Sequence, residues 1–380
     1  MASSGGKIQG FERVDHRLAR LRELMAEKGM DAFVLMVLER ANSESCHYIS
    51  GFRGSSAALI IDKKEATLVT DGRYRTQAAA QSPFKLIVQS EMPLASFIAK
   101  AVSDAGWGTV GFESGNVSHR IFEVMFAPVK TQWVDATDFI PSLRRTKDAS
   151  EVESIKKAAR IGRDAYGAML DQVQPGMTEV EFDSALLAEI KRRGAEKGWA
   201  HDDFIVASGK NGAMCHARAT GKAFEDGDTV TVDYGAMVDG YMSDITRNFA
   251  VKHVQDKARE INAILLEAHH AAAAALRPGT AGKDVDAVAR RIIINAGYGK
   301  DFVHGLGHGL GLAIHEAPRL APLSKDVLQV GDVVTIEPGI YIEGWGGLRI
   351  EDDYLITEDG AECLTVNDNQ SLGIAGQQKV

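Results

Sequence analysis

The second half of the chain contains one short pattern twice, with an acidic residue at the same place in each copy. Residues 227–235 read GDTVTVDYG and residues 331–339 read GDVVTIEPG, so an offset of 104 positions sets Asp233 over Glu337. In both copies the acidic residue follows an apolar run that is typical of a buried strand. A repeated unit restricts the chain to folds that are built from two related halves.

A second match supports the duplication. Pro175-Gly176 corresponds to Pro278-Gly279 at an offset of 103 positions, and a helix-like stretch follows each pair, at 180–193 and 285–296. Each half therefore reads as a helix, a Pro-Gly turn, a second helix and a strand hairpin. We expect an antiparallel sheet with helices on one face and pseudo-two-fold symmetry.

Length, composition and charge limit the possible functions. A chain of 380 residues is long for one domain and suits two. The net charge of −9 argues against non-specific binding to nucleic acid. No stretch approaches the ~20 consecutive apolar residues that a membrane helix needs. We expect neither nucleic acid nor a membrane as a partner.

The cysteines and the N-terminus predict a compartment. Cys46, Cys215 and Cys363 are odd in number and far apart, which favours a reducing environment over a disulfide framework. Residues 1–10 are polar and rich in glycine and serine, without the apolar core of a signal peptide. These features predict a cytoplasmic protein.

The first ~145 residues read as a layered α/β domain, because helical and strand patterns alternate along them. Apolar positions at helical spacing predict a helix over 15–29, with Gly29 as its stop. Strands are expected at 32–38, 57–61, 66–70 and 109–112.

A boundary between two domains is expected within 141–148. We predict an N-terminal domain over 1–145 and a second domain over 146–380. Just after the boundary, Ser150 is a candidate N-cap for a helix with acidic residues in its first turn.

An Asp-Gly pair predicts how the first acidic hairpin is paired. Asp239-Gly240 lies between apolar residues, which is a strong signal for a two-residue turn. With this turn, Val238 pairs with Tyr241, and Gly235 pairs with Asp244.

In that register Asp233 and Asp244 lie on one face as diagonal neighbours, roughly 7 Å apart or less at Cβ. Two carboxylates this close repel each other unless a cation lies between them. The alternative is a solvated acidic surface of the hairpin. The apolar run before Asp233 argues against that alternative.

The second copy repeats the arrangement. A hairpin centred near Gly344 sets Glu337 opposite Glu351, which lies on an expected strand over 348–356. Arg349 precedes Glu351 by two positions and shares its face. Its guanidinium can hydrogen-bond a carboxylate or a substrate oxygen, or it can simply balance charge.

A glycine-rich segment supplies a nitrogen ligand. Glycine occupies every odd position from 305 to 311, which predicts backbone packed closely against its neighbours. His304 and His308 share a face if this segment is extended. One imidazole, His308, with four carboxylates suits a divalent metal, and the oxygen-rich set favours Mn²⁺ over Co²⁺ or Zn²⁺.

Together these strings resemble the pitta-bread metallopeptidases, and most closely the Xaa-Pro peptidases (prolidase and aminopeptidase P). The motifs are VDYG, SDITR, GHGLG, IEPG and RIED, each weak alone but specific in this order and spacing. Residues 48–56 and 70–74 resemble the N-terminal domain that prolidases, aminopeptidase P and creatinase share. Methionine aminopeptidases lack that domain, and creatinase lacks the metal ligands.

The resemblance implies a fold and a site. The fold is an α/β N-terminal domain plus an α+β pitta-bread catalytic domain with pseudo-two-fold duplicated halves. Two divalent metal ions are implied, with Asp233 binding one, Asp244 and Glu351 bridging both, and His308 and Glu337 completing the second. The remaining matches are substrate-site histidines, His216, His304 and His315, and two residues beside the ligands that also serve substrate binding, Tyr341 and Arg349.

The implied reaction is hydrolysis of the peptide bond between an N-terminal residue and proline. A water shared by the two metals would attack the carbonyl, with Glu337 as general base. His304 and His315 would hydrogen-bond the oxyanion or the substrate carboxylate, which makes them and His216 catalytic candidates. Short proline-containing peptides and a second copy of the chain, in a homodimer, are the implied partners.

One position departs from the family pattern. Family members usually have proline directly before the histidine that corresponds to His216, and this chain has Cys215. The departure leaves the geometry of His216 and the shape of the proline pocket open. Independently of it, the alternative functions are an aminopeptidase of another specificity at the same two-metal site and a non-catalytic peptide-binding module. The choice between a dipeptidase and an aminopeptidase for longer peptides stays open.

Overall fold

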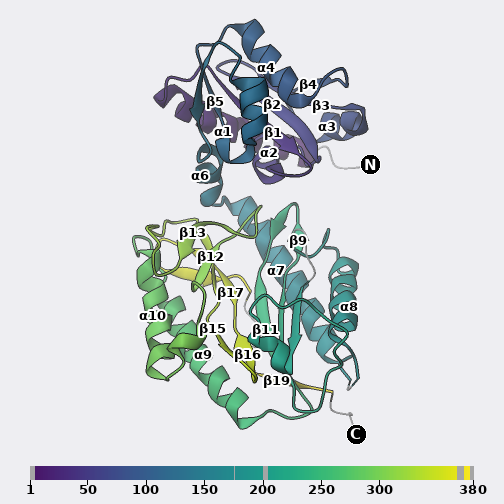
Figure 1. Cartoon of the computed structure of the whole chain (residues 1–380), viewed down its shortest axis with the longest axis vertical. Helices are drawn as coiled ribbons and strands as arrows, with labels where there is room; N and C mark the ends of the chain where they lie inside the picture. The colour runs from purple at the N-terminus through teal and green to yellow at the C-terminus, as the bar shows by residue number, and fades with distance from the viewer. Residues whose placement is uncertain (1–4, 175, 200–203, 366–371, 377–380) are drawn as a thin grey trace. The chain divides into compact units, whose positions relative to one another are not determined.

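The computed structural model of the protein describes residues 5–174, 176–199, 204–365 and 372–376. The chain divides into two units, Met1–Arg144 and Arg145–Val380 (Figure 1). Among the described residues, no helix combines the length and the apolar character that crossing a membrane requires.

The N-terminal unit is built on a mixed six-stranded sheet in the order β4-β3-β2-β1-β5-β6. The strand at its centre, β1, pairs antiparallel with β2 and parallel with β5. Its strands are β1 (Ala32–Leu38), β2 (Ser56–Asp62), β3 (Ala66–Thr70), β4 (Lys85–Val88), β5 (Thr109–Phe112) and β6 (Gln132–Asp135). The four strands predicted here are confirmed, because continuous apolar runs are a strong local signal.

Helices cover this sheet. The helix predicted over 15–29 corresponds to α1, which begins earlier, at Gly5, and ends at Glu27. Leu21 and Met25 are buried, and Gly29, just after its end, has a positive φ of 65°. The helices are α1 (Gly5–Glu27), α2 (Ser43–Ser50), α3 (Arg75–Gln81), α4 (Leu94–Ala105), α5 (His119–Ile121) and α6 (Phe139–Arg145), with short turns η1 (Gly72–Tyr74), η2 (Ser114–Asn116) and η3 (Phe122–Phe126).

The first half of the second unit contains two helices and a four-stranded sheet in the order β19-β11-β8-β7. The helices are α7 (Ala149–Leu170) and α8 (Glu179–Arg192). The strands are β7 (Ile205–Ser208), β8 (Thr229–Tyr234), β11 (Ile245–Val251) and β19 (Gly373–Ala375), and β9 (Met237–Val238) pairs with β10 (Tyr241–Met242). A short helix, η4 (Gly209–Ala213), follows β7.

The second half repeats this order with a five-stranded sheet, β13-β12-β14-β17-β18. Its helices are α9 (Asp256–Ala274), α10 (Gly282–Asn295) and the short η5 (Gly299–Asp301). Its strands are β12 (Gly307–Gly309), β13 (Glu316–Leu320), β14 (Val333–Ile336), β17 (Asp352–Ile356) and β18 (Ala361–Cys363), with a separate hairpin of β15 (Gly339–Ile342) and β16 (Gly346–Arg349).

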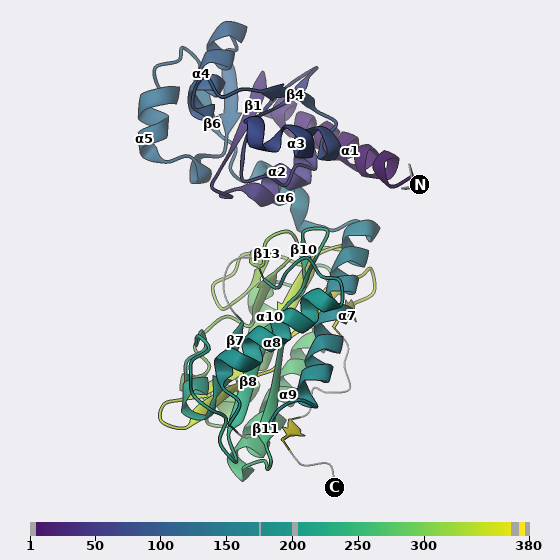
Figure 2. The same ribbon diagram turned by 90° about the vertical axis from the view of Figure 1, so that its right-hand side faces the viewer.

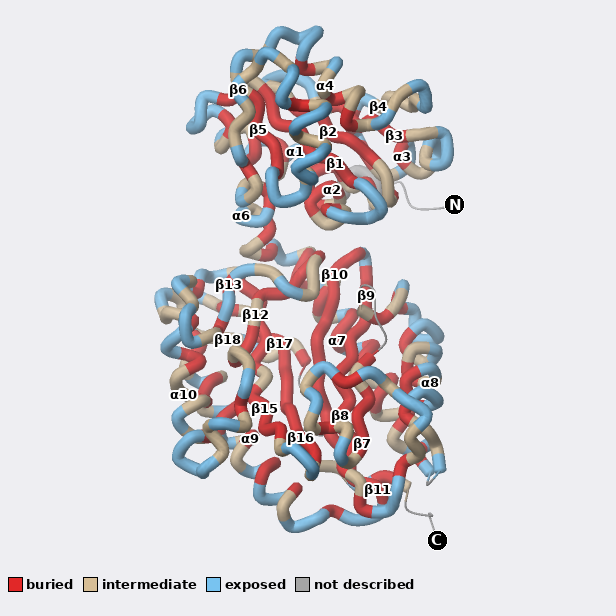
Figure 3. Tube along the Cα trace, in the orientation of Figure 1, coloured by how far each residue is buried: buried red, intermediate tan, exposed pale blue. Residues whose placement is uncertain are grey.

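Each half has its own apolar core beneath its own helices. The sequence predicts one antiparallel sheet, whereas the structure has two larger sheets that meet at a bridge between Thr246 and Glu351. Tyr166 and Phe182 lie in the first core, and Leu265 and Ile293 lie in the second. Figure 2 shows α7 and α8 beside β7 and β8, and Figure 3 shows that the strands between the helices are buried.

The helix starts and turns follow local signals with one correction. The N-cap of α7 is Asp148 and not Ser150, because the Asp148 carboxylate accepts from the Ser150 and Glu151 amides and Glu151 bonds back to the Asp148 amide. In the predicted Pro-Gly turns, Gly176 and Gly279 have φ of 93° and 86°. Pro175 lies outside the described residues.

Candidate metal centre

The first acidic hairpin has the predicted register. Val238 pairs with Tyr241 across Asp239 and Gly240, whose φ angles of 51° and 85° suit a two-residue turn. The same register continues below the turn, where Tyr234 pairs with Ile245.

Asp233 pairs with Thr246 in this register, and Asp244 precedes Thr246 by two positions. The two carboxylates are thus diagonal neighbours, as the turn predicted, and both residues are buried. The charge of Asp233 contributes to raising the pKa of Asp244, as is expected for neighbouring carboxylates.

The second hairpin is centred on Gly344, also as predicted. Gly339 pairs with Arg349, and the Ile350 amide donates to the Pro338 carbonyl, which sets Glu337 opposite Glu351. The single strand expected over 348–356 is wrong, however, because β16 ends at Arg349 and β17 begins at Asp352.

The interruption turns Glu351 toward the first half of the unit. Its amide donates to the Thr246 carbonyl at 3.2 Å, and its Oε2 accepts from Thr246 Oγ1 at 2.6 Å. Glu351 therefore closes the junction between the two halves, and this contact holds the carboxylates from both hairpins together.

His308 is positioned by glycines on both sides. A Cβ atom on Gly307 would collide with the Thr335 carbonyl, and one on Gly309 would collide with the Ala317 carbonyl. Only glycine allows β12 to lie this close to its neighbours, which confirms the close packing that the sequence predicts.

The imidazole of His308 is oriented for ligation. Its Nδ1 lies 3.1 Å from the Gly309 carbonyl, so Nδ1 carries the proton and Nε2 is left with a lone pair. Nε2 lies 3.4 Å from Glu337 Oε1 and 3.7 Å from Asp244 Oδ2. Burial and the charge of His315 lower the pKa of His308 to about 3, which keeps the ring neutral.

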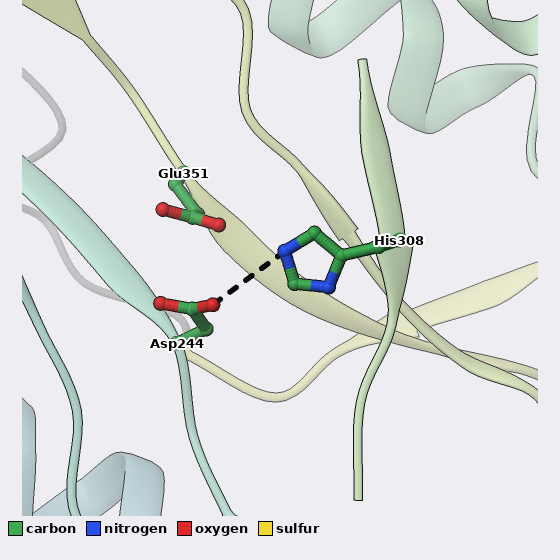
Figure 4. Close-up of side chains that lie close together, drawn as sticks. All are labelled: Asp244, His308 and Glu351. Carbon is green, nitrogen blue, oxygen red and sulfur yellow. Dashed lines mark ion pairs between the residues drawn. The ribbon is translucent and has the colours of Figure 1, made fainter. Parts of the chain in front are cut away.

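Three predicted ligands converge. Asp244, His308 and Glu351 each place one ligand atom so that these atoms lie within 4.8 Å of one another (Figure 4). Glu337 lies next to this group, with its Oε1 close to His308 Nε2. Asp233 lies at its edge, where Oδ2 accepts a hydrogen bond from Arg349 Nη2.

The charges of this cluster are not balanced by the chain. Burial raises the pKa of Asp244, Glu337 and Glu351, the last to about 8, and the neighbouring carboxylates raise all three further. Burial also raises the pKa of Asp233, although Arg349 opposes the effect. Buried Oδ1 atoms of Asp233 and Asp244 have no hydrogen-bond partner among the described residues. Buried oxygens without donors, beside an unprotonated imidazole nitrogen, fit divalent cations.

Arg349 connects the carboxylates to the predicted substrate residues. Its Nη1 donates to Tyr341 Oη at 2.9 Å and to the Cys215 carbonyl at 3.2 Å. Its Nε donates to Thr246 Oγ1 at 3.0 Å. The guanidinium is buried, so it fixes these groups in place as well as contributing its charge.

The three other histidines surround the cluster. His304 Nδ1 lies 2.7 Å from the Gly305 carbonyl and Nε2 lies 2.9 Å from Tyr341 Oη, so both ring nitrogens are engaged. The His315 ring contacts that of His308, with centroids 4.3 Å apart. His216 is exposed and lies within electrostatic reach of Asp233, His304 and His315.

Two residues beside the ligands are missed by the sequence analysis. Thr246 bonds both Glu351 and Arg349, and Asp353 Oδ2 accepts from the Asp244 amide at 3.0 Å. Both lie two positions after a predicted ligand, and strand alternation places such residues on the same face. That spacing is the signal that could have identified them.

Comparison with known proteins agrees with this geometry. Residues 153–358 match the model of metallopeptidase family M24, and residues 17–146 match the creatinase/prolidase N-terminal domain. The chain belongs to metallopeptidase family M24. The family and its prolidase relatives make the protein a peptidase, and the family implies divalent metal ions.

Individual M24 relatives are similar over nearly their whole length. A Xaa-Pro dipeptidase of Pyrococcus furiosus is 37% identical over 94% of this chain and 99% of its own. A solved Xaa-Pro dipeptidase from Bacillus anthracis has a TM-score of 0.88 and 36% identity, over 95% of this chain and 99% of the other. A solved X-Pro aminopeptidase from Thermotoga maritima has a TM-score of 0.86 and 35% identity, over 94% and 100%.

Proposed function

We propose that this M24 peptidase hydrolyses the bond between an N-terminal residue and proline. The observation that carries the proposal is the convergence of Asp244, His308 and Glu351 in a buried site with unpartnered carboxylate oxygens. The similar proteins named as Xaa-Pro dipeptidases and as an X-Pro aminopeptidase support the substrate class.

The proposed metal site uses residues from both halves. Asp233, Asp244, His308, Glu337 and Glu351 would hold two divalent ions, with Mn²⁺ favoured by the oxygen-rich set. When bound, such ions polarise the scissile carbonyl and lower the pKa of a coordinated water. Their charge would also offset the repulsion among the carboxylates.

Glu337 is the proposed general base. It follows β14 at the edge of the cluster, with Oε1 3.4 Å from His308 Nε2 and Oε2 3.9 Å from His304 Nδ1. A carboxylate there would remove a proton from the attacking water and deliver it to the proline nitrogen, which has no hydrogen of its own.

His304 and His315 act as neutral hydrogen-bonding groups. Burial and the Arg349 charge lower the pKa of His304 to about 4, and burial together with Arg319 lowers that of His315. Neutral rings can stabilise an oxyanion or a substrate carboxylate by donating a hydrogen bond. Because both nitrogens of His304 are engaged, His315 and the exposed His216 are better placed to contact the substrate.

The departure at Cys215 leaves the backbone anchored. The Cys215 carbonyl accepts from Arg349 Nη1, so the segment that leads to His216 is tied to the cluster without a proline. The contact uses the backbone carbonyl, so cysteine provides it at position 215 as well as proline would.

The domain bounds, the compartment and the oligomeric state are proposed from the family resemblance and from composition. We assign 1–145 to the N-terminal domain and 146–380 to the catalytic domain, and we expect a cytoplasmic homodimer. Sedimentation of the purified protein would test the oligomeric state.

The deciding experiment uses metal-stripped protein refilled with Mn²⁺. The substrates are a Xaa-Pro dipeptide, a Xaa-Pro-Xaa tripeptide and a matched tripeptide with alanine in place of proline. Cleavage of the dipeptide alone identifies a dipeptidase, and cleavage of the proline tripeptide identifies an aminopeptidase. Faster cleavage of the alanine peptide, or no cleavage by protein that holds metal, would contradict the proposal.

A further inference from the structure

A cavity of about 450 Å³ lies in the catalytic unit, away from the carboxylate cluster. The cavity lies along the junction between β8 and β16. At one end of this junction Arg349 bonds Asp233, and further along it Thr231 Oγ1 donates to the Gly347 carbonyl at 3.0 Å. Thr229 lines the cavity, four positions before Asp233. At ~3.3 Å per residue along a strand, the two ends are about 13 Å apart.

The charges that line the cavity are balanced. Lys222 and Asp228 form an ion pair with each other, and Asp228 also accepts from the Glu225 amide. Lys210 and Glu225 are exposed, and neither side chain has a hydrogen-bond or ion-pair partner in the part of the chain that the structure describes. One free ammonium and one free carboxylate favour a ligand that carries both charges over a simple anion or cation.

An aromatic side chain supplies an apolar surface. Trp345 lines the cavity at the tip of the β15–β16 hairpin, and Lys257 Nζ lies 4.9 Å from its ring centroid. Next to it, Gly346 packs against the Gly209 carbonyl, 2.6 Å from where a Cβ atom would stand. The cavity volume lies within the range of small-molecule sites, roughly 300–1,000 Å³.

We propose that this cavity is a second binding site, specific for a free amino acid with an apolar side chain. Lys210 binds the carboxylate, Glu225 binds the ammonium group, and the Trp345 indole contacts the side chain. The three recognition groups match the three parts of such a zwitterion. The inference does not depend on the proposed peptide specificity, because binding here involves none of the carboxylates of the cluster.

The test measures binding to metal-free protein that carries Asp244→Asn and 5-fluorotryptophan. The chain has four tryptophans, so four fluorine resonances are expected, and Trp345→Phe identifies the one at the cavity. The probes are L-leucine, 4-methylpentanoate, which lacks the ammonium group, and 3-methylbutylamine, which lacks the carboxylate.

L-Leucine is expected to shift the Trp345 resonance, and each single-charge analogue is expected to bind at least about tenfold more weakly. Lys210→Met and Glu225→Gln should each weaken leucine binding by a similar factor. Lys283→Met, at an exposed lysine on α10, should leave it unchanged.

Three outcomes would overturn the proposal. Equal binding of 4-methylpentanoate and leucine would indicate an anion site. Lys210→Met and Glu225→Gln replace exposed residues and should fold normally. If both variants bind leucine as the wild type does, Lys210 and Glu225 do not contact it. A shift confined to other tryptophans, or none at all, would place leucine elsewhere or exclude it.

Discussion

Two adjacent carboxylates at the start of β17, Glu351 and Asp352, lie in opposite electrostatic environments although both are buried. Asp352 Oδ1 accepts from Arg247 Nη2 and Thr365 Oγ1, each at 2.6 Å, and His269 Nε2 lies 3.3 Å from Oδ2. Burial tends to raise the pKa of Asp352, but Arg247 and His269 outweigh it and hold that pKa below its usual range. On the other face, the pKa of Glu351 is raised to about 8.

The two carboxylates differ in whether a positively charged side chain compensates them. At Asp352 the chain provides its own cation, Arg247, at hydrogen-bonding distance. At the cluster, four carboxylates lie around one guanidinium of the described chain, that of Arg349, which bonds Asp233. The missing positive charge is what metal ions would provide. Substitutions can therefore test the cluster and the Asp352–Arg247 pair separately.

The largest effect is expected for Glu337→Gln. Removing the proposed base should lower kcat by about 10²–10⁴-fold, because general-base catalysis contributes a factor of that size. Steady-state kinetics of the Mn²⁺ enzyme would measure it. Glu343→Gln, at an exposed residue in the β15–β16 turn, is the matched control and should keep full activity. A Glu337→Gln variant with unchanged kcat would refute the assigned role.

On the balanced side, Asp352→Asn should lower the free energy of unfolding by roughly 3–5 kcal/mol, since it leaves the buried Arg247 charge uncompensated. Urea unfolding of metal-free protein at pH 7 would measure the change. Asp359→Asn, at an exposed position, should have no measurable effect. A loss below about 1 kcal/mol would show that the pair is not structural.

At the junction between the two halves of the unit, Thr246→Val removes the hydroxyl that donates to Glu351 and accepts from Arg349. Metal affinity should fall by about 10–100-fold, the usual consequence of losing a group that orients a ligand. Titration of stripped protein with Mn²⁺ would report it, and Thr246→Ser should restore most of the affinity. Equal affinity in the valine variant would show that Glu351 needs no such support.

The smallest effect concerns the metal-free protein. Asp244→Asn relieves repulsion and should stabilise it by about 1 kcal/mol while abolishing metal-dependent stabilisation. In the folded protein the pKa of Glu351 is raised from its ordinary value of 4.5 to about 8. The protonated Glu351 side chain therefore contributes fully to the free energy of unfolding below pH 4.5, and this contribution is lost as the pH rises through 8. Wild-type stability should therefore decline from pH 5 to 8, with a shallower decline in the variant. Stability that rises over this range would contradict the picture.

The parts of the site that the sequence predicts are those governed by local rules. The Asp239-Gly240 turn and strand alternation determine how Asp233 lies relative to Asp244, and the structure has that register. The alternating glycines likewise predict the close packing on both sides of His308. These signals act within a dozen residues, so no knowledge of the tertiary structure is needed.

The parts that the sequence does not predict depend on contacts between distant segments. The break between β16 and β17 occurs because Glu351 bridges to Thr246, more than 100 positions earlier. The sheet expected as one is instead two sheets, and this bridge is where they meet. Arg247 and Asp352 are 105 positions apart, and no pattern in the sequence pairs them; the tertiary fold does.

The two hairpins also differ in length, and this difference has an evolutionary consequence. Strands β9 and β10 have two residues each, whereas β15 and β16 have four each. The proposed ligands at the base of each hairpin are fixed by the geometry of the cluster, whereas the residues at the tips do not take part in it. After the duplication, the second copy could lengthen at Gly344 and acquire Trp345 without disturbing the chemistry below. A duplicated unit can thus lengthen at its tips, where the proposed second site lies, while the carboxylates at the base of each hairpin keep their places.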